Sequence, residues 1–139
     1  MRPRYETPYD RGQQRRAISA FCEAFRCEAT ATPELAAWDY DIVRDGRTVA
    51  VVEVKCRLCK HDTYPTYMIG LRKMERLREA ASEEVAAILL VAWQDRMGFV
   101  HADTAISTGM KAHGGRTDRG DPLDTEVVLH IPIDRFRMV

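Results

Sequence analysis

The chain has 139 residues, of which 45% are hydrophobic and 30% charged, and this is typical of one globular domain, not of a disordered chain, a collagen or a disulfide scaffold. Lys plus Arg and Asp plus Glu both number 21, so a polyanionic partner would have to be bound by a local basic patch. The longest apolar run, at 85–93, is shorter than the roughly 20 residues of a membrane-spanning helix, and residues 1–8 contain no signal-like apolar stretch, so we expect no membrane span and a cytoplasmic protein.

The first half of the chain predicts a helix followed by a hairpin. Between Gln13 and about Cys27, Ile18, Phe21 and Phe25 recur at helical spacing, which indicates an amphipathic helix. Two segments rich in Val, Ile, Trp and Tyr, at 36–44 and 48–56, flank Asp45-Gly46. This dipeptide between apolar runs favours a tight β-hairpin.

The second half predicts one more helix and several strands. A helix is expected at 67–81, with Gly70, Met74, Leu77 and Ala81 on one stripe. The apolar run at 85–93 predicts a central strand covered on both faces, followed by a short strand at 99–102. The Gly- and Arg-rich segment 109–122 predicts a mobile loop, and 125–133 a last strand. We therefore expect an α/β fold with a mixed central sheet flanked by helices, as a single domain over 1–139 whose core spans about 10–102.

The motif Glu53-Val54-Lys55 ends a strand whose preceding residues, 49–52, are all apolar. Charged side chains two residues apart on a strand project from the same face. An ordinary, partly exposed ion pair is one interpretation. The other is a functional site at the edge of the sheet.

The preceding strand supplies a second acid, either Asp39 or Asp41. Two adjacent carboxylates repel each other unless a divalent cation or another positive charge compensates them. With a three- or five-residue loop, or with a bulge, Asp39 lies closer to Glu53 than Asp41 does, whereas a strict two-residue turn puts both aspartates on the other face. We choose Asp39 on this reasoning.

The four cysteines, at 22, 27, 56 and 59, leave another possibility open. Cys56 and Cys59 are close in sequence and His61 follows, but a structural zinc site usually needs two such pairs. Cys22 lies on the apolar stripe of the first helix, where a thiol packs as a small hydrophobic group. A Cys56/Cys59 metal module is therefore kept as a minor alternative, which metal analysis of the purified protein tests.

The order of these features resembles the PD-(D/E)XK, or restriction-endonuclease-like, nucleases: a leading helix, Asp39 at a strand start, the hairpin, Glu53-x-Lys55, a helix and a buried strand. The resemblance covers about residues 10–102 and implies a core of αβββαβ type. The context Trp38-Asp39-Tyr40, together with Tyr64-Pro65-Thr66 and Lys73, is similar to small phage or prophage nucleases.

The resemblance implies roles for individual residues. Asp39, Glu53 and the backbone carbonyl of Val54 would coordinate Mg²⁺ or Mn²⁺, and Lys55 would orient the attacking water and stabilise charge on the phosphate. The family often carries a glutamate on the first helix, where this chain has Gln14 on the inward face, and the missing charge leaves a second metal site open. Lys73 is assigned a supporting phosphate-binding role. The expected basic rim for the nucleic-acid backbone comprises Arg57, Lys60, Arg72 and Arg76.

From these features we predict a metal-dependent DNA endonuclease that processes phage or mobile-element DNA. The alternative is a non-catalytic nucleic-acid-binding or assembly module on the same fold. Retention of Asp39, Glu53 and Lys55 together favours the enzyme. The sequence leaves open DNA or RNA, with DNA favoured, the structure of the substrate, one or two metal ions, and a possible homodimer.

Overall fold

The computed structural model describes residues 8–113 and 126–139. Its central sheet contains six strands in the order β1-β2-β3-β5-β6-β9. These strands are β1 (Glu28–Ala31), β2 (Tyr40–Arg44), β3 (Arg47–Cys56), β5 (Ala86–Ala92), β6 (Met97–His101) and β9 (Arg137–Met138). The β3–β5 pair is parallel and the other pairs are antiparallel, so the sheet is mixed, as predicted.

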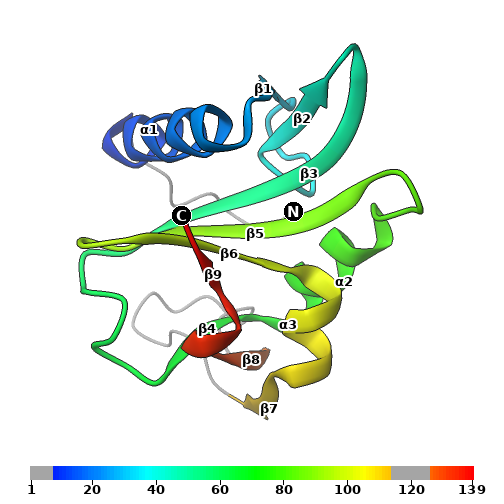
Figure 1. The fold of residues 1–139 in the computed structure, drawn as a ribbon. Coiled ribbons are helices and arrows are strands. Elements are labelled where there is room, and N and C mark those ends of the chain that lie inside the picture. Colours follow the sequence, from blue (N-terminus) through cyan, green and yellow to red (C-terminus); the bar gives the residue numbers. More distant parts are fainter. Residues whose placement is uncertain (1–7, 114–125) are drawn as a thin grey trace.

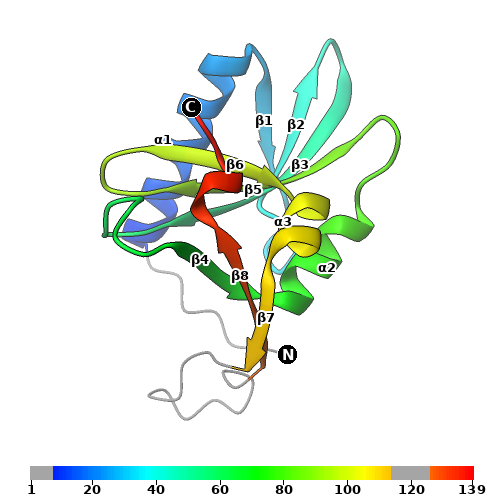
Figure 2. The same ribbon diagram turned by 60° about the horizontal axis from the view of Figure 1, so that its bottom comes forward.

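A second sheet and the helices complete the fold. The second sheet has the order β4-β8-β7. Its strands are β4 (Thr66–Gly70), β8 (Val127–Pro132) and β7 (Met110–His113), and the helices are α1 (Pro8–Phe25), α2 (Leu71–Glu79), α3 (Ala102–Thr108) and the 3-10 turn η2 (Ile133–Arg135). Helix α1 crosses one face of the central sheet, while α2, α3 and the second sheet lie on the other (Figure 1). Figure 2 shows β4, β8 and β7 side by side, with α2 and α3 next to them. No helix in the described part of the chain is long and apolar enough to cross a membrane.

The central sheet separates two hydrophobic clusters because successive strand residues point to opposite faces. Val52 and Val54 of β3 pack with Ile18 and Phe21 of α1 on one face. Val51 of β3 belongs to the cluster on the other face, with Met74 and Leu77 of α2 and core residues of β4 and β8. Strand β5 contributes to both clusters, which confirms the prediction of a central strand covered on both faces.

The hairpin between β2 and β3 is closed by a two-residue turn. Asp45 and Gly46 have φ of 51° and 76°, the left-handed values that this turn requires at both positions. Arg44 therefore pairs with Arg47, but the register shifts between Ile42 and Val43. Val49 of β3 is the extra residue at this bulge, so the residues of β2 before Val43 pair one position further along β3, and the bulge condition stated for the choice of Asp39 is met.

The predicted helix at 67–81 is wrong at its start. Residues 66–70 form β4, which pairs with β8, and α2 begins only at Leu71. Tyr67 and Ile69 are buried and Met68 is exposed, the alternation of a strand, and pairing with a distant segment overrides the helical spacing of Gly70 and Met74.

Other predicted boundaries also change. The strand expected at 36–44 begins at Tyr40, and the first helix begins at Pro8. The short elements β1, α3, β7 and β9 were not predicted from the sequence. Residues 110–113 of the expected mobile loop form β7, and the rest of that loop, 114–122, lies outside the described residues. Strand β8 confirms the strand expected at 125–133.

Candidate active site

The candidate site lies where β3 extends beyond β2. Strand β2 begins at Tyr40, opposite Val52, so the last residues of β3 have no strand beside them on that edge. Asp39 fills part of the gap. Its N–H donates to the Val52 carbonyl (2.9 Å), and its Oδ2 accepts a hydrogen bond from the Val54 N–H (2.8 Å). The open edge thus holds the Asp39 carboxylate directly against the Glu53-Val54-Lys55 segment.

Glu53 is the buried charged residue of the described chain, with a relative exposure of 3%. Its Oε2 lies 3.5 Å from Lys55 Nζ and 3.1 Å from Lys73 Nζ. Lys73 comes from the first turn of α2, and its approach to Glu53 depends on β4 and α2 being packed beneath the central sheet. An unpaired buried carboxylate would strongly destabilise the fold, so the contacts with both ammonium groups stabilise Glu53 at this position.

The electrostatics differ between the two acids. Burial, and then the charge of Glu53, raises the pKa of Asp39 to about 6, although the Val54 N–H and the lysines act against this increase. Burial also lowers the pKa of Lys55, despite the favourable charge of Glu53. Both lysine contacts go to Glu53, so Asp39 is the acid that is short of positive charge. A proton or a cation would stabilise it.

Gln14 reaches the same edge from α1. Its Nε2 donates to the Val54 carbonyl over 3.4 Å, a long contact, so the structure brings Gln14 to the backbone oxygen that the sequence analysis assigned as a ligand. The site then offers oxygen donors from the Asp39 and Glu53 carboxylates and from Val54. Hard divalent cations such as Mg²⁺ and Mn²⁺ prefer oxygen donors. This donor set fits such a cation.

A second group of metal-ligand types was not predicted from the sequence. His61, Asp62 and Asp95 have ligand atoms within 4.8 Å of one another. Asp95 already accepts hydrogen bonds from the His61 N–H (2.9 Å) and, with its other oxygen, contacts His61 Nδ1 (2.7 Å). The contact joins the loop after β3 to the β5–β6 turn. These two segments are far apart in the sequence and no motif connects them, so the sequence does not reveal the group.

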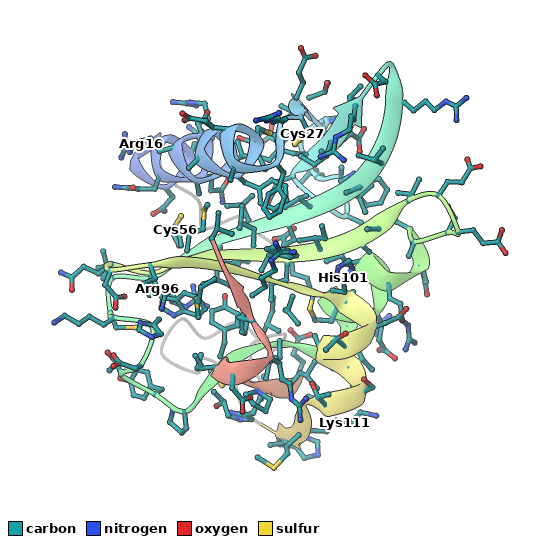
Figure 3. The ribbon with its side chains drawn as sticks, in the orientation of Figure 1. Arg16, Cys27, Cys56, Arg96, His101 and Lys111 are labelled. Carbon is teal, nitrogen blue, oxygen red and sulfur yellow. The ribbon has the colours of Figure 1, made fainter. Side chains whose placement is uncertain are left out.

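Cys56 and Cys59 are not brought together as a ligand pair. Figure 3 shows Cys56 on the α1 side of the central sheet, the face to which Val52 and Val54 also point. Cys59 instead packs against the cluster on the opposite face. Among residues 8–113 and 126–139, no set of three metal-ligand side chains includes either cysteine, so the zinc alternative gains no support.

The four residues of the expected basic rim are all exposed. Arg72 and Arg76 are one helical turn apart on α2. Arg57 follows β3, and its guanidinium carbon lies 4.7 Å from the centre of the Tyr67 ring. Within the described part of the chain none of the four, including Lys60, is paired with a carboxylate. Their charges remain available to an anionic partner.

Tyr67 is a feature of the site region that the sequence analysis did not single out as a site residue. It is 3% exposed, yet its hydroxyl is the buried side-chain polar atom without a hydrogen-bond partner in the described part of the chain. Such a group costs about 1–3 kcal/mol of folding free energy. No sequence pattern signals it, because it arises from the packing of β4 beneath β3.

A known protein family matches the whole chain. The family model described as phage putative PDDEXK endonuclease matches residues 1–139. The matched region includes all the residues of the candidate site described above. None of the curated proteins matches the chain at a significant level.

Proposed function

The chain belongs to the phage putative PDDEXK endonuclease family, and from this premise we propose that it is a metal-dependent DNA endonuclease. It would hydrolyse phosphodiester bonds in phage or mobile-element DNA, in the cytoplasm of the host cell. The observation that carries the proposal is the meeting of Asp39, Glu53 and Lys55 at one open strand edge. Burying an acidic side chain such as Glu53 costs folding free energy unless it is paired, and this cost favours a functional role over a fold used only for binding.

Asp39, Glu53 and the Val54 carbonyl would hold Mg²⁺ or Mn²⁺. A cation bound there supplies positive charge that polarises the phosphate and promotes attack by water. The hydrogen bond from the Val54 N–H to Asp39 Oδ2 supports this assignment, because it holds that carboxylate beside Glu53 and Val54. A cation there would take the place of the ammonium groups that lie 3.5 Å and 3.1 Å from Glu53 Oε2.

The lysines have separate roles in the proposed reaction. Lys55, which shares a strand face with Glu53, would orient the attacking water and stabilise the charge that develops on the phosphate. Lys73, with a side chain 43% exposed, would bind a phosphate oxygen. A cation bound to Glu53 would neutralise its carboxylate. Both ammonium groups would then be free to contact the water and the phosphate. Gln14 would remain a neutral hydrogen-bonding partner at the Val54 carbonyl.

Nucleic acid would lie across the basic residues around this edge, Arg57, Lys60, Arg72 and Arg76. Contacts from these side chains to phosphates would be electrostatic and independent of base sequence, so binding should weaken as the salt concentration rises. We favour DNA over RNA as the substrate. The proposal also includes a homodimer, in which two chains act together.

The proposal is tested by comparing linear, nicked, single-stranded and four-way-junction DNA with RNA of matching sequence. Each substrate is incubated with Mg²⁺, Mn²⁺ or EDTA. Cleavage of DNA that depends on the metal and is blocked by EDTA is expected. Binding of DNA without cleavage under any of these conditions would instead favour the non-catalytic module.

Asp39→Asn should weaken Mn²⁺ binding roughly tenfold or more, because a neutral amide is a poor ligand for a hard cation. The fold should survive, since the Asn oxygen can still accept the Val54 N–H. Asp41→Asn should have little effect, because Asp41 pairs with Val51 and its Oδ1 accepts from Trp38 Nε1 at 2.7 Å.

Calorimetric Mn²⁺ titration distinguishes these variants. Asp95→Asn serves as a second control, because it removes a carboxylate from the exposed His61 group without touching the candidate site. A larger loss of affinity in Asp41→Asn than in Asp39→Asn would move the ligand to Asp41. Loss of the metal-dependent cleavage in Asp95→Asn would place the functional cation at the His61 group.

The raised pKa of Asp39, about 6, predicts how the metal-free protein responds to pH. The folded state binds the proton more tightly than the unfolded chain does, so ionisation of Asp39 destabilises the fold as pH rises from about 4 to 6. The free energy of unfolding attributable to Asp39 should fall on the order of 1–2 kcal/mol across this range. Denaturant unfolding of the native protein and of Asp39→Asn at several pH values measures the difference. Equal slopes in both proteins would contradict it.

A further inference from the structure

Tyr67 of β4 is buried in the hydrophobic cluster that also contains residues of the central sheet. Its ring packs edge-on against Trp93 and Phe136, with centroid distances of 6.2 Å and 6.1 Å, and Arg57 covers it. A phenylalanine would make all these ring contacts. The hydroxyl therefore adds nothing to the packing and, having no partner, destabilises the fold described here.

The surroundings of the hydroxyl identify the group it is suited to bind. Arg57 and Glu53 are the charged residues that act on it most strongly, and burial raises the pKa of Tyr67, so the hydroxyl remains a protonated donor at neutral pH. Lys55 and Lys73 both contact Glu53 at its Oε2. Glu53 follows Val51 on the same face of β3, and Val51 packs in the cluster that contains Tyr67. The hydroxyl is therefore a donor without an acceptor, in the cluster that adjoins the Glu53 carboxylate.

We propose that Tyr67 is a positioning residue whose hydroxyl donates a hydrogen bond to the Glu53 carboxylate, directly or through one water, when Glu53 binds a divalent cation. The inference rests on the proposed function, because it concerns Glu53 with a cation bound. In that state Lys73 would contact a phosphate oxygen and no longer Glu53. Carboxylates that bind metals are commonly fixed by hydrogen bonds from groups that do not touch the metal, and these groups tune affinity. Tyr67 would orient the buried carboxylate of Glu53.

Tyr67→Phe tests the proposal, because it removes only the hydroxyl. Stability of the metal-free protein should be unchanged or increased, since no hydrogen bond is lost and an unpaired polar group is removed. Mn²⁺ affinity, measured by calorimetry, should fall about 10- to 100-fold. Tyr64→Phe is the matched control: its side chain is 64% exposed, and the same chemical change there should leave both quantities unaltered.

Opposite changes in stability and metal affinity would separate a positioning role from simple packing. If Tyr67→Phe binds Mn²⁺ as the native protein does, the positioning role is wrong while the proposed function stands. If the metal-free variant is less stable than the native protein, the hydroxyl has a partner in the metal-free fold and the inference is overturned. If the native protein itself binds no Mn²⁺, the proposed metal site fails, and this inference fails with it.

Discussion

Glu53→Gln should abolish metal-dependent cleavage, lowering the single-turnover rate by about 10³-fold or more, the scale of losing an electrostatic group at a reacting phosphate. The amide has nearly the same shape, so the side chain can still fill its buried position. It lacks the charge that a hard cation requires from a ligand. The change also leaves the ammonium groups of Lys55 and Lys73 without the carboxylate they contact, and the free energy of unfolding should fall by about 1–3 kcal/mol.

Two measurements are needed because cleavage and stability both change. Denaturant unfolding establishes that the variant is folded at the assay temperature, and single-turnover cleavage is then compared at saturating Mn²⁺. Glu79→Gln, at an exposed position of α2, provides the matched control and should leave both quantities unchanged. Full cleavage by folded Glu53→Gln would rule out the proposed mechanism.

Lys55→Met distinguishes a catalytic lysine from a structural ion pair. If Lys55 orients water and stabilises the transition state, its loss should reduce the cleavage rate by about 10²- to 10³-fold. Mn²⁺ affinity should hold steady or rise, because a positive charge 3.5 Å from Glu53 Oε2 has been removed. Lys73 remains as a partner for Glu53, at 3.1 Å, so the carboxylate is not left unpaired in the metal-free protein.

Single-turnover cleavage and Mn²⁺ titration of Lys55→Met distinguish the catalytic role of Lys55 from a purely structural ion pair. Lys111→Met, in the exposed strand β7 of the second sheet, tests the effect of losing a lysine elsewhere and should change neither quantity (Figure 3). A modest loss of cleavage in Lys55→Met would show that the lysine only neutralises Glu53. A large loss with intact metal binding would support the catalytic role.

Patterns within short windows of the chain were sufficient to predict several parts of this protein. The apolar content of 48–56 and 85–93 predicted two central strands, and Asp45-Gly46 predicted the hairpin that joins 36–44 to 48–56, because these features depend on neighbouring residues alone. The two-residue spacing of Glu53 and Lys55 likewise predicted that both side chains lie on one face of β3, and the structure has them in contact there. The order of these elements also carried the resemblance to the nuclease family.

Other features depended on contacts between distant segments. The turn alone would direct Asp39 to the wrong face, and only the bulge after Ile42, set by the pairing of β2 with β3, brings its carboxylate to Val54. The helical spacing at 67–81 concealed β4, which exists because β8 pairs with it. That pairing in turn places Tyr67 under the central sheet and sets the start of α2, from which Lys73 reaches Glu53. Register and packing across such separations depend on which surfaces are buried together, and this is decided by the assembled fold and not by local propensity.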